Sequence, residues 1–164
     1  MADGTVYIGS DDHKVYALDA ATGRPRWTYK SEAPGTDSMF MAPGTFYSSP
    51  AVADGTVYVG SNDTKVYALD AATGRPRWAY TTGAYIENGS FETTTHAVSG
   101  PAVAGGTVYV GSYNHNMYAL DAATGRPRWT YTTGGSVASG PAVADGTVYI
   151  GSDDHKVYAL TAGS

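Results

Sequence analysis

Four short segments rich in Asp, Asn and His contain the residue types that could bind a metal ion. The sequence Asp-Asp-His occupies residues 11–13 and again residues 153–155, and related triplets occupy 62–64 and 113–115. Carboxylates and imidazoles are ordinary metal ligands, but this spacing is too short and too common to indicate a site. Asp and Asn are expected at these places from turn geometry alone. We therefore predict turns here, with no metal and no cofactor.

Two longer segments, 30–49 and 81–100, combine aromatic and Met side chains with acidic residues and a histidine. Apolar anchors surrounded by polar groups are typical of surfaces that recognise a peptide or a small ligand. Alternatively, the segments cover the rest of the fold or pair with each other. The candidate ligand-binding residues are Met39, Phe40, Met41, Tyr47, Tyr85, Glu87, Phe91 and His96, and we expect Glu32, Asp37, Phe46, Ile86 and Glu92 on the same surface.

The composition argues against several other functions. The formal net charge is -5 and no run of basic residues could follow a phosphate backbone, so we expect no nucleic-acid partner. No apolar stretch approaches the roughly 20 residues that span a bilayer, so we expect no membrane insertion. The absence of cysteine excludes disulfides, thiolate zinc sites and cysteine nucleophiles, and it does not identify a compartment. No catalytic triad or carboxylate pair can be singled out, so we predict no catalytic residue.

The elements that must position these residues form a repeat. The tetrapeptide Gly-Thr-Val-Tyr begins at positions 4, 55, 106 and 146, so successive copies are 51, 51 and 40 residues apart. A period of about 40 residues with four strands per unit is typical of a β-propeller blade. β-branched and aromatic runs separated by Gly, Asp and Asn predict the strands of one unit. These are strand A at 99–104, strand B at 106–112, strand C at 116–122 and strand D at 125–131.

The sequence YALDAATGRPRW occurs unchanged at 16–27, 67–78 and 118–129. It resembles the tryptophan-docking motif of PQQ-like (quinoprotein-type) β-propeller repeats, A-x-D-x-x-T-G-x-x-x-W. The resemblance implies that each Trp wedges between adjacent blades. Asp and Thr can hold the tight C–D turn, where Gly can adopt positive φ. The blade-docking residues are then Asp19, Asp70, Asp121, Thr22, Thr73, Thr124, Gly23, Gly74, Gly125, Trp27, Trp78 and Trp129.

The Arg-Pro-Arg triplet within each copy lies on strand D, at the predicted outer edge of a blade. Proline and exposed charge at an edge prevent further sheet pairing, which favours this interpretation over a basic ligand clamp. The perfect identity of the copies indicates recent duplication or deliberate design, two origins that the sequence does not distinguish.

The predicted fold class is all-β, a β-propeller of four-stranded antiparallel blades with about four blades in the chain. Residues 1–164 form a single propeller unit in which the first blade lacks strand A and the last lacks strand D. The predicted segments are blade 1 at 3–29, blade 2 at 47–80, blade 3 at 98–131 and blade 4 at 138–160, with long inserts at 30–49 and 81–100. In propellers the D–A and B–C loops emerge on one face, so we expect both inserts beside the B–C turns.

Residues 2–18 and 144–160 are identical. A partial ring exposes two apolar blade faces, and a second copy would cover them in a closed symmetric assembly. We therefore expect a homodimer that closes an eight-bladed ring. In an alternative six-bladed dimer, blade 4 takes strand D from the partner's first blade and displaces the duplicated B–C pair. A single chain that closes four blades is the third arrangement.

The family resemblance also implies a similarity to quinone-dependent dehydrogenases. It implies that their sites need adjacent cysteines, a stacking Trp and a calcium carboxylate cluster, yet this chain has no Cys and all three Trp residues lie in docking motifs. Propellers of this repeat type also serve as scaffolds in membrane-protein assembly and as sensor regions of bacterial kinases. We predict a non-catalytic scaffold that self-assembles and binds a protein or small ligand through its inserts. The alternatives are a purely structural or engineered propeller without a ligand, and a fragment of a quinone-dependent dehydrogenase.

Overall fold

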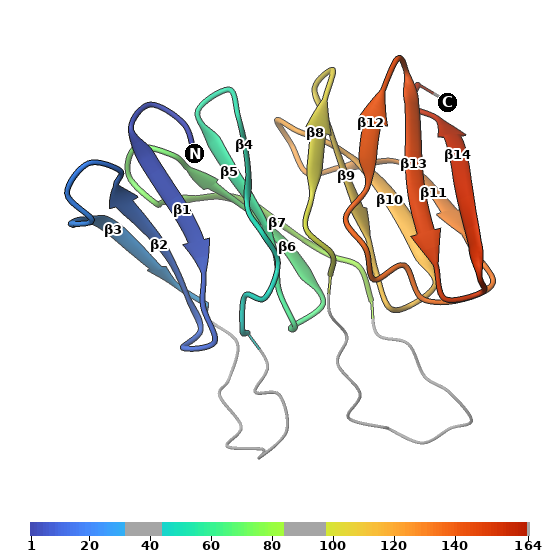
Figure 1. Cartoon of the computed structure of the whole chain (residues 1–164), viewed down its shortest axis with the longest axis horizontal. Helices are drawn as coiled ribbons and strands as arrows, with labels where there is room; N and C mark the ends of the chain where they lie inside the picture. Colours follow the sequence, from blue (N-terminus) through green and yellow to red (C-terminus); the bar gives the residue numbers. More distant parts are fainter. Residues whose placement is uncertain (32–43, 84–97, 164) are drawn as a thin grey trace.

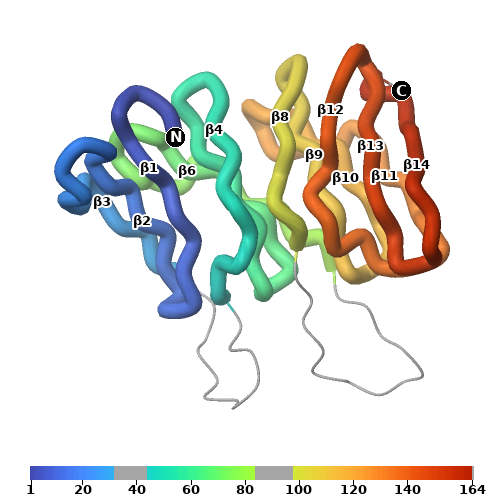
Figure 2. Tube along the Cα trace, viewed as in Figure 1, coloured from blue at the N-terminus to red at the C-terminus, as the bar shows by residue number. Residues whose placement is uncertain are grey.

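The computed structural model describes residues 1–31, 44–83 and 98–163. Their regular structure is β throughout, arranged as four antiparallel sheets that stand side by side in chain order (Figure 1). Figure 2 shows the N-terminus on the first sheet and the C-terminus on the last, at opposite sides of this row. Within the described ranges, no helix has the length and apolarity needed to cross a membrane.

The sheets correspond to the predicted blades, and we call them blades 1 to 4. Blade 1 contains β1 (Thr5–Gly9), β2 (Lys14–Asp19) and β3 (Pro25–Lys30). Blade 2 contains β4 (Ala51–Ala53), β5 (Thr56–Gly60), β6 (Lys65–Asp70) and β7 (Pro76–Thr81). Blade 3 contains β8 (Ala102–Ala104), β9 (Thr107–Gly111), β10 (Asn116–Asp121) and β11 (Pro127–Thr132). Blade 4 contains β12 (Ala142–Ala144), β13 (Thr147–Ser152) and β14 (Lys156–Thr161).

The strand order confirms the predicted all-β blade architecture. Blades 2 and 3 have the complete order A-B-C-D, whereas blade 1 has strands B, C and D and blade 4 has strands A, B and C among the described residues. The predicted A strand over 99–104 is regular only over Ala102–Ala104 because Pro101 has no N–H for the ladder. Instead, the Ser99 hydroxyl accepts a hydrogen bond from the Gly111 amide at 2.8 Å.

Tight turns join the strands within each blade. The A–B turn of blade 2 has positive φ at both Asp54 (46°) and Gly55 (67°), as the Asp-Gly pair of a type I′ hairpin requires. Strand C pairs with strand D through a register shift, so that Leu69 lies opposite Pro76. Proline is tolerated at this bulge on the outer strand because no ladder hydrogen bond is needed there.

The core lies between the blades. Each blade has a front face, formed by residues equivalent to Val57, Val59, Tyr67 and Leu69, which packs toward the preceding blade. Its back face, formed by residues equivalent to Tyr58, Val66 and Ala68, packs toward the following blade. Three clusters result, one at each of the three joints between the four blades. A single blade therefore cannot bury its apolar faces without neighbours.

The prediction that Phe46 belongs to an exposed ligand-binding surface is wrong. Its side chain is 1% exposed and packs between blades 1 and 2, with its ring 5.6 Å from that of Tyr67. The backbone of Phe46 lies so close to Gly9 that a Cβ there would be 2.4 Å from the Phe46 carbonyl oxygen. Val137 covers Gly111 in the same way between blades 3 and 4. The last residues of each D–A link are therefore part of a joint.

Candidate functional site

The first two joints between blades are built around a tryptophan and a glycine. The Trp27 indole N–H donates to the Ala71 carbonyl at 2.9 Å, and the Trp78 indole N–H donates to the Ala122 carbonyl at 3.0 Å. A Cβ on Gly74 would lie 2.6 Å from the Trp27 ring, and the geometry at Gly125 beneath Trp78 is the same. Each indole is thus enclosed between its own blade and the C–D turn of the next blade.

The third joint has only part of this arrangement. The Tyr109 hydroxyl donates to the Ala162 carbonyl at 2.8 Å, as Tyr58 does to Ala122 at 3.1 Å. The Trp129 indole N–H, however, is buried without a hydrogen-bond partner among the described residues. At the other end of the chain, Gly23 has the same positive φ as Gly74 but no described atom within 4 Å of its Cβ position. Among the described residues, Trp129 therefore has no glycine turn against its ring, and Gly23 has no tryptophan against it; we call these two residues unmatched.

Each C–D turn is held by an Asp-Thr-Arg set. The Asp70 carboxylate accepts hydrogen bonds from the Thr73 amide at 2.9 Å and hydroxyl at 2.8 Å, and from the Arg77 guanidinium at 2.7 Å. The Arg77 guanidinium also donates to the Thr56 hydroxyl at 2.7 Å. These bonds, the one from Arg77 foremost, lower the pKa of Asp70 to about 2. The same contacts recur around Asp121 and Asp19.

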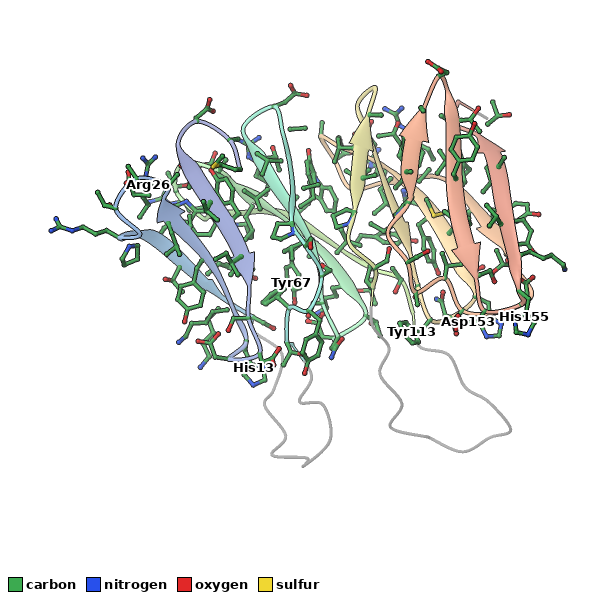
Figure 3. All side chains as sticks on the ribbon, viewed as in Figure 1. His13, Arg26, Tyr67, Tyr113, Asp153 and His155 are labelled. Carbon is green, nitrogen blue, oxygen red and sulfur yellow. The ribbon has the colours of Figure 1, made fainter. Side chains whose placement is uncertain are left out.

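The arginines of these sets were missed as structural residues by the sequence analysis. Arg26, Arg77 and Arg128 were interpreted only as edge charges, whereas each ties strand D to strand B of its own blade. Figure 3 labels Arg26 on blade 1. The available signal was the constant spacing of seven residues between Asp and Arg in all three copies.

The two terminal blades expose side chains that are buried in the inner blades. Ile8 on the front face of blade 1 is 43% exposed, whereas Val59 at the same position in blade 2 is fully buried. Val157 on the back face of blade 4 is 79% exposed, whereas Val66 is fully buried. Tyr149 beside it is 44% exposed, against 2% for Tyr58. The front face of blade 1 and the back face of blade 4 therefore present apolar side chains with no neighbouring blade among the described residues.

The B–C turns and the ends of the D–A links share one end of the blades, as the propeller topology predicts. Figure 3 places His13, Tyr113, Asp153 and His155 there. The Asp153 amide donates to the Ser136 carbonyl of the D–A link at 2.9 Å. No group of three or more His, Cys, Asp or Glu side chains that could hold a metal ion occurs in the part of the chain that the structure describes.

The aspartates of these turns have a structural contact instead. The Tyr16 hydroxyl donates to the Asp12 carboxylate at 2.5 Å and lowers its pKa to about 2. Tyr158 does the same for Asp154, whose pKa is also about 2, and Tyr67 donates to Asp63. The residue after each Asp, such as His155, adopts a positive φ near 68°. The tyrosine therefore fixes a turn whose backbone is sterically demanding.

A pocket of about 510 Å³ lies on the inner side of the row, where the chain enters the A strands of blades 2, 3 and 4. The Ser-Pro and Gly-Pro segments before β4, β8 and β12 form its wall, and Tyr47 and Tyr113 lie at its border. Tyr47 is 55% exposed. The structure thus places Tyr47 and Tyr113, from two different loops, at one pocket. The other candidate ligand-binding residues, Met39, Phe40, Met41, Tyr85, Glu87, Phe91 and His96, lie outside the described residues.

Comparison with known proteins places this architecture in a family. The family model described as outer membrane protein assembly factor BamB matches residues 1–94 and 88–164. The serine/threonine-protein kinase AfsK of Streptomyces griseus is 39% identical over 131 residues, which cover 80% of this chain and 15% of the kinase. The dehydrogenase subunit of a quinone alcohol dehydrogenase from Gluconobacter oxydans is 32% identical over 141 residues, 81% of this chain and 18% of that protein. The chain therefore spans less than a fifth of these relatives.

Solved structures show the same fold at lower sequence identity. BamB from Moraxella catarrhalis superposes with a TM-score of 0.74 at 24% identity, covering 97% of this chain and 43% of that chain. A quinohemoprotein alcohol dehydrogenase from Pseudomonas putida superposes with a TM-score of 0.78 at 22% identity. The superposition covers 100% of this chain and 32% of the dehydrogenase. The computationally designed Ika4 protein superposes with a TM-score of 0.70 at 17% identity. The superposition covers 98% of this chain and 87% of the Ika4 chain. With the family match over both halves, the chain belongs to the PQQ-like β-propeller repeat family whose model is named for the assembly factor BamB.

Proposed function

We propose that this chain is a non-catalytic repeat scaffold that associates with a second copy through its terminal blades. The proposal rests on the different exposure of equivalent positions in two blades. Val157 of blade 4 is 79% exposed, whereas Val66 of blade 2 is fully buried. Leaving such faces in water is unfavourable, and large exposed apolar patches mark interaction sites. The absence of cysteine supports a role without the quinone chemistry of some relatives.

The front face of blade 1 and the back face of blade 4 have the same side chains as the faces that pack together at the internal joints. The front face of blade 1 is the kind of surface that back faces already contact at the three internal joints. Head-to-tail contact between two copies would repeat this joint and close a ring, which satisfies both faces in a symmetric dimer. Face-to-face closure yields eight blades, and closure through a shared blade yields six.

Val157→Glu is expected to prevent the association. The charge would be solvated in the single chain, because Val157 is largely exposed, but it would be buried without a partner in the dimer. We expect the dimer to weaken by about 100-fold or more, since an uncompensated buried charge costs several kcal/mol. Light scattering after size-exclusion chromatography, over a dilution series, measures the change.

Ala79→Glu is the matched control, because Ala79 is exposed on the outer strand of blade 2, away from both terminal faces. This variant should associate like the parent chain. A parent chain that stays monomeric at all concentrations, or a Val157→Glu variant that associates normally, would contradict the proposed assembly.

We also propose that the inner pocket, together with the long inserts, binds an extended peptide. The pocket of about 510 Å³, with an aromatic residue 55% exposed at its border, supports a binding role on the scaffold. Ligand pockets combine apolar and aromatic side chains with a small number of polar groups, and this pocket is lined by Tyr, Pro and Val together with Ser and Gly residues. The alternative is a purely structural or engineered ring without a ligand; the computationally designed Ika4 protein shares this fold.

A peptide selection discriminates between these two functions. A random peptide library displayed on phage would be selected against the parent chain and against Tyr47→Ala, which removes an exposed side chain and should leave the fold intact. Peptides that bind the parent and lose about tenfold or more in affinity on Tyr47→Ala would support the binding role, since a buried aromatic anchor is worth 1.4 kcal/mol or more. Equal recovery on both proteins would favour the purely structural ring.

A further inference from the structure

The outer edge of β14 differs from the edges of the other three C strands. Strands β2, β6 and β10 each pair with a D strand, namely β3, β7 and β11. No described strand pairs with β14 on that side. Beside this edge lies a cavity of about 490 Å³, lined by Trp129, Thr130 and Tyr131 of blade 3 and by Ala159, Leu160 and Thr161 of blade 4. The cavity therefore occupies the place that a D strand would take in blade 4.

Trp129 shows what that place requires. At the complete joints, the glycine turn that leads into strand D lies directly against the indole of the preceding blade. At the third joint, the acceptor carbonyl of Ala162 is in position, since it already binds the Tyr109 hydroxyl. Trp129 nevertheless has no hydrogen-bond partner among the described residues. The element that this joint needs is a Thr-Gly turn followed by a D strand.

We propose that the open edge of β14 binds strand β3 of a second copy, with Gly23 of that copy placed against Trp129. This inference deepens the proposed self-association, because it names the strand that joins the two copies. Strand β3 pairs with β2, and residues 14–18 of β2 are identical to residues 156–160 of β14. The register of blade 1 would therefore be reproduced, with Trp27 opposite Ala159 and Pro25 opposite Leu160.

The strand exchange replaces the contacts that it breaks with equivalent contacts, so we expect it to change the free energy of those contacts little. Residues 144–160 would take the place of residues 2–18 of the other copy, and the two hairpins have the same sequence. Val157 would replace Val15 against blade 2, and Ala159 would replace Ala17, so the buried faces are unchanged. Exchange of identical elements between copies is a low-cost route to dimers.

The exchange also adds contacts that blade 1 does not have. The incoming hairpin brings strand β12, which pairs with β13, whereas β1 has no described A strand beside it. It also matches the unmatched Trp129 with the unmatched Gly23. Each chain has three docking tryptophans and three docking glycines, so a dimer with shared blades contains six blades and six complete joints. Face-to-face closure of eight blades would leave Trp129 and Gly23 unmatched.

A synthetic peptide of residues 22–31, TGRPRWTYKS, tests the strand site directly. We expect one labelled peptide to bind per chain, measured by fluorescence anisotropy and native mass spectrometry, and to convert dimers into peptide-bound monomers. The matched control is the same peptide with Gly23→Val, because a side chain at the equivalent Gly74 would overlap the Trp27 ring at 2.6 Å. This control should bind about tenfold more weakly or worse.

A second control fills the site within the chain. In this variant, residues 161–164 are replaced by a copy of residues 19–31, which continues the identical C strand into its own D strand. The peptide should no longer bind to this protein. Peptide binding that is unaffected by both the Gly23→Val control and this extension would overturn the proposal.

Ile8→Glu distinguishes a dimer formed by strand exchange from a dimer formed by face-to-face closure. Ile8 is 43% exposed in the single chain, and in the exchanged dimer it belongs to the released hairpin, so the variant should still associate. In face-to-face closure, Ile8 would be buried, and Ile8→Glu would disrupt the dimer as strongly as Val157→Glu. A parent chain that dimerises, ignores the peptide and is disrupted by Ile8→Glu would overturn strand exchange and leave self-association intact. A chain that binds the peptide but stays monomeric would show a strand-binding edge at β14 and would overturn its occupation by a second copy.

Discussion

Trp78→Ala is expected to lower the free energy of unfolding by about 3 kcal/mol, the lower end of the range for large aromatic side chains in cores, because Trp78 is partly buried. Trp78 contacts blade 3 through its ring, which lies against Gly125, and through its N–H, which donates to Ala122. Its ring centroid is also 5.8 Å from that of Tyr58. Urea unfolding followed by circular dichroism, at a concentration where the parent is monomeric, measures the loss.

Trp129→Ala provides a control of the same residue type in the same repeat sequence. Trp129 keeps its contact with Tyr109, at a centroid distance of 5.9 Å, but its N–H has no described partner and no glycine turn covers it. We expect a loss that is smaller by about 1–2 kcal/mol, because an indole hydrogen bond and its packing partner are absent. Equal losses in the two variants would show that the neighbouring turn contributes nothing measurable.

Gly60→Ala is expected to destabilise the chain by about 1–3 kcal/mol or more through overpacking. The added Cβ would lie 2.6 Å from the carbonyl oxygen of Val98 and 2.7 Å from that of Ser99. Both are backbone atoms of the next blade, so no side-chain rotation relieves the overlap, and the joint between blades 2 and 3 must open. The midpoint of thermal unfolding should fall accordingly.

Gly151 occupies the same place in blade 4 and supplies the matched control. A Cβ at Gly151 would be 3.3 Å from the Ser139 hydroxyl, which belongs to a side chain of the same blade. Neither glycine has a positive φ, so backbone strain does not separate the two positions. At a concentration where both proteins are monomeric, we expect Gly151→Ala to unfold within about 0.5 kcal/mol of the parent, because a small shift of the Ser139 hydroxyl relieves its single close contact. A loss at Gly151 as large as that at Gly60 would contradict the steric argument.

Much of the local structure could be predicted from the sequence, because it depends on short-range chemistry. The Asp-Gly and Thr-Gly pairs specify turns with positive φ, and the alternation of Val, Tyr and Leu specifies strands with two apolar faces. The period of the repeats gave the number of sheets and identified which strand is absent from the first and last blades. These features lie within one repeat unit, so counting residues was sufficient.

The role of the loop ends was decided by tertiary structure. Phe46 looked like part of a binding surface, since its neighbours in sequence are aromatic and polar, yet it fills the joint between blades 1 and 2. Likewise, the sequence indicates only edge charges for the arginines of strand D, whereas each bonds to the Asp of strand C and to the Thr of strand B. The constant Asp-to-Arg spacing is compatible with these contacts, but only the folded strands show that the two side chains meet.

By itself, the sequence determined that the chain forms propeller blades with identical docking motifs, because each repeat encodes its own strands, turns and two apolar faces. Only the tertiary structure decided that the joints are unequal, because identical residues acquire different surroundings from their neighbours. The indole N–H groups of Trp27 and Trp78 each donate to a carbonyl and their rings lie against a glycine turn, whereas Trp129 has neither partner among the described residues. That difference arises from the position of a blade in the row, which no repeat encodes, and it directs the proposed contact between two copies.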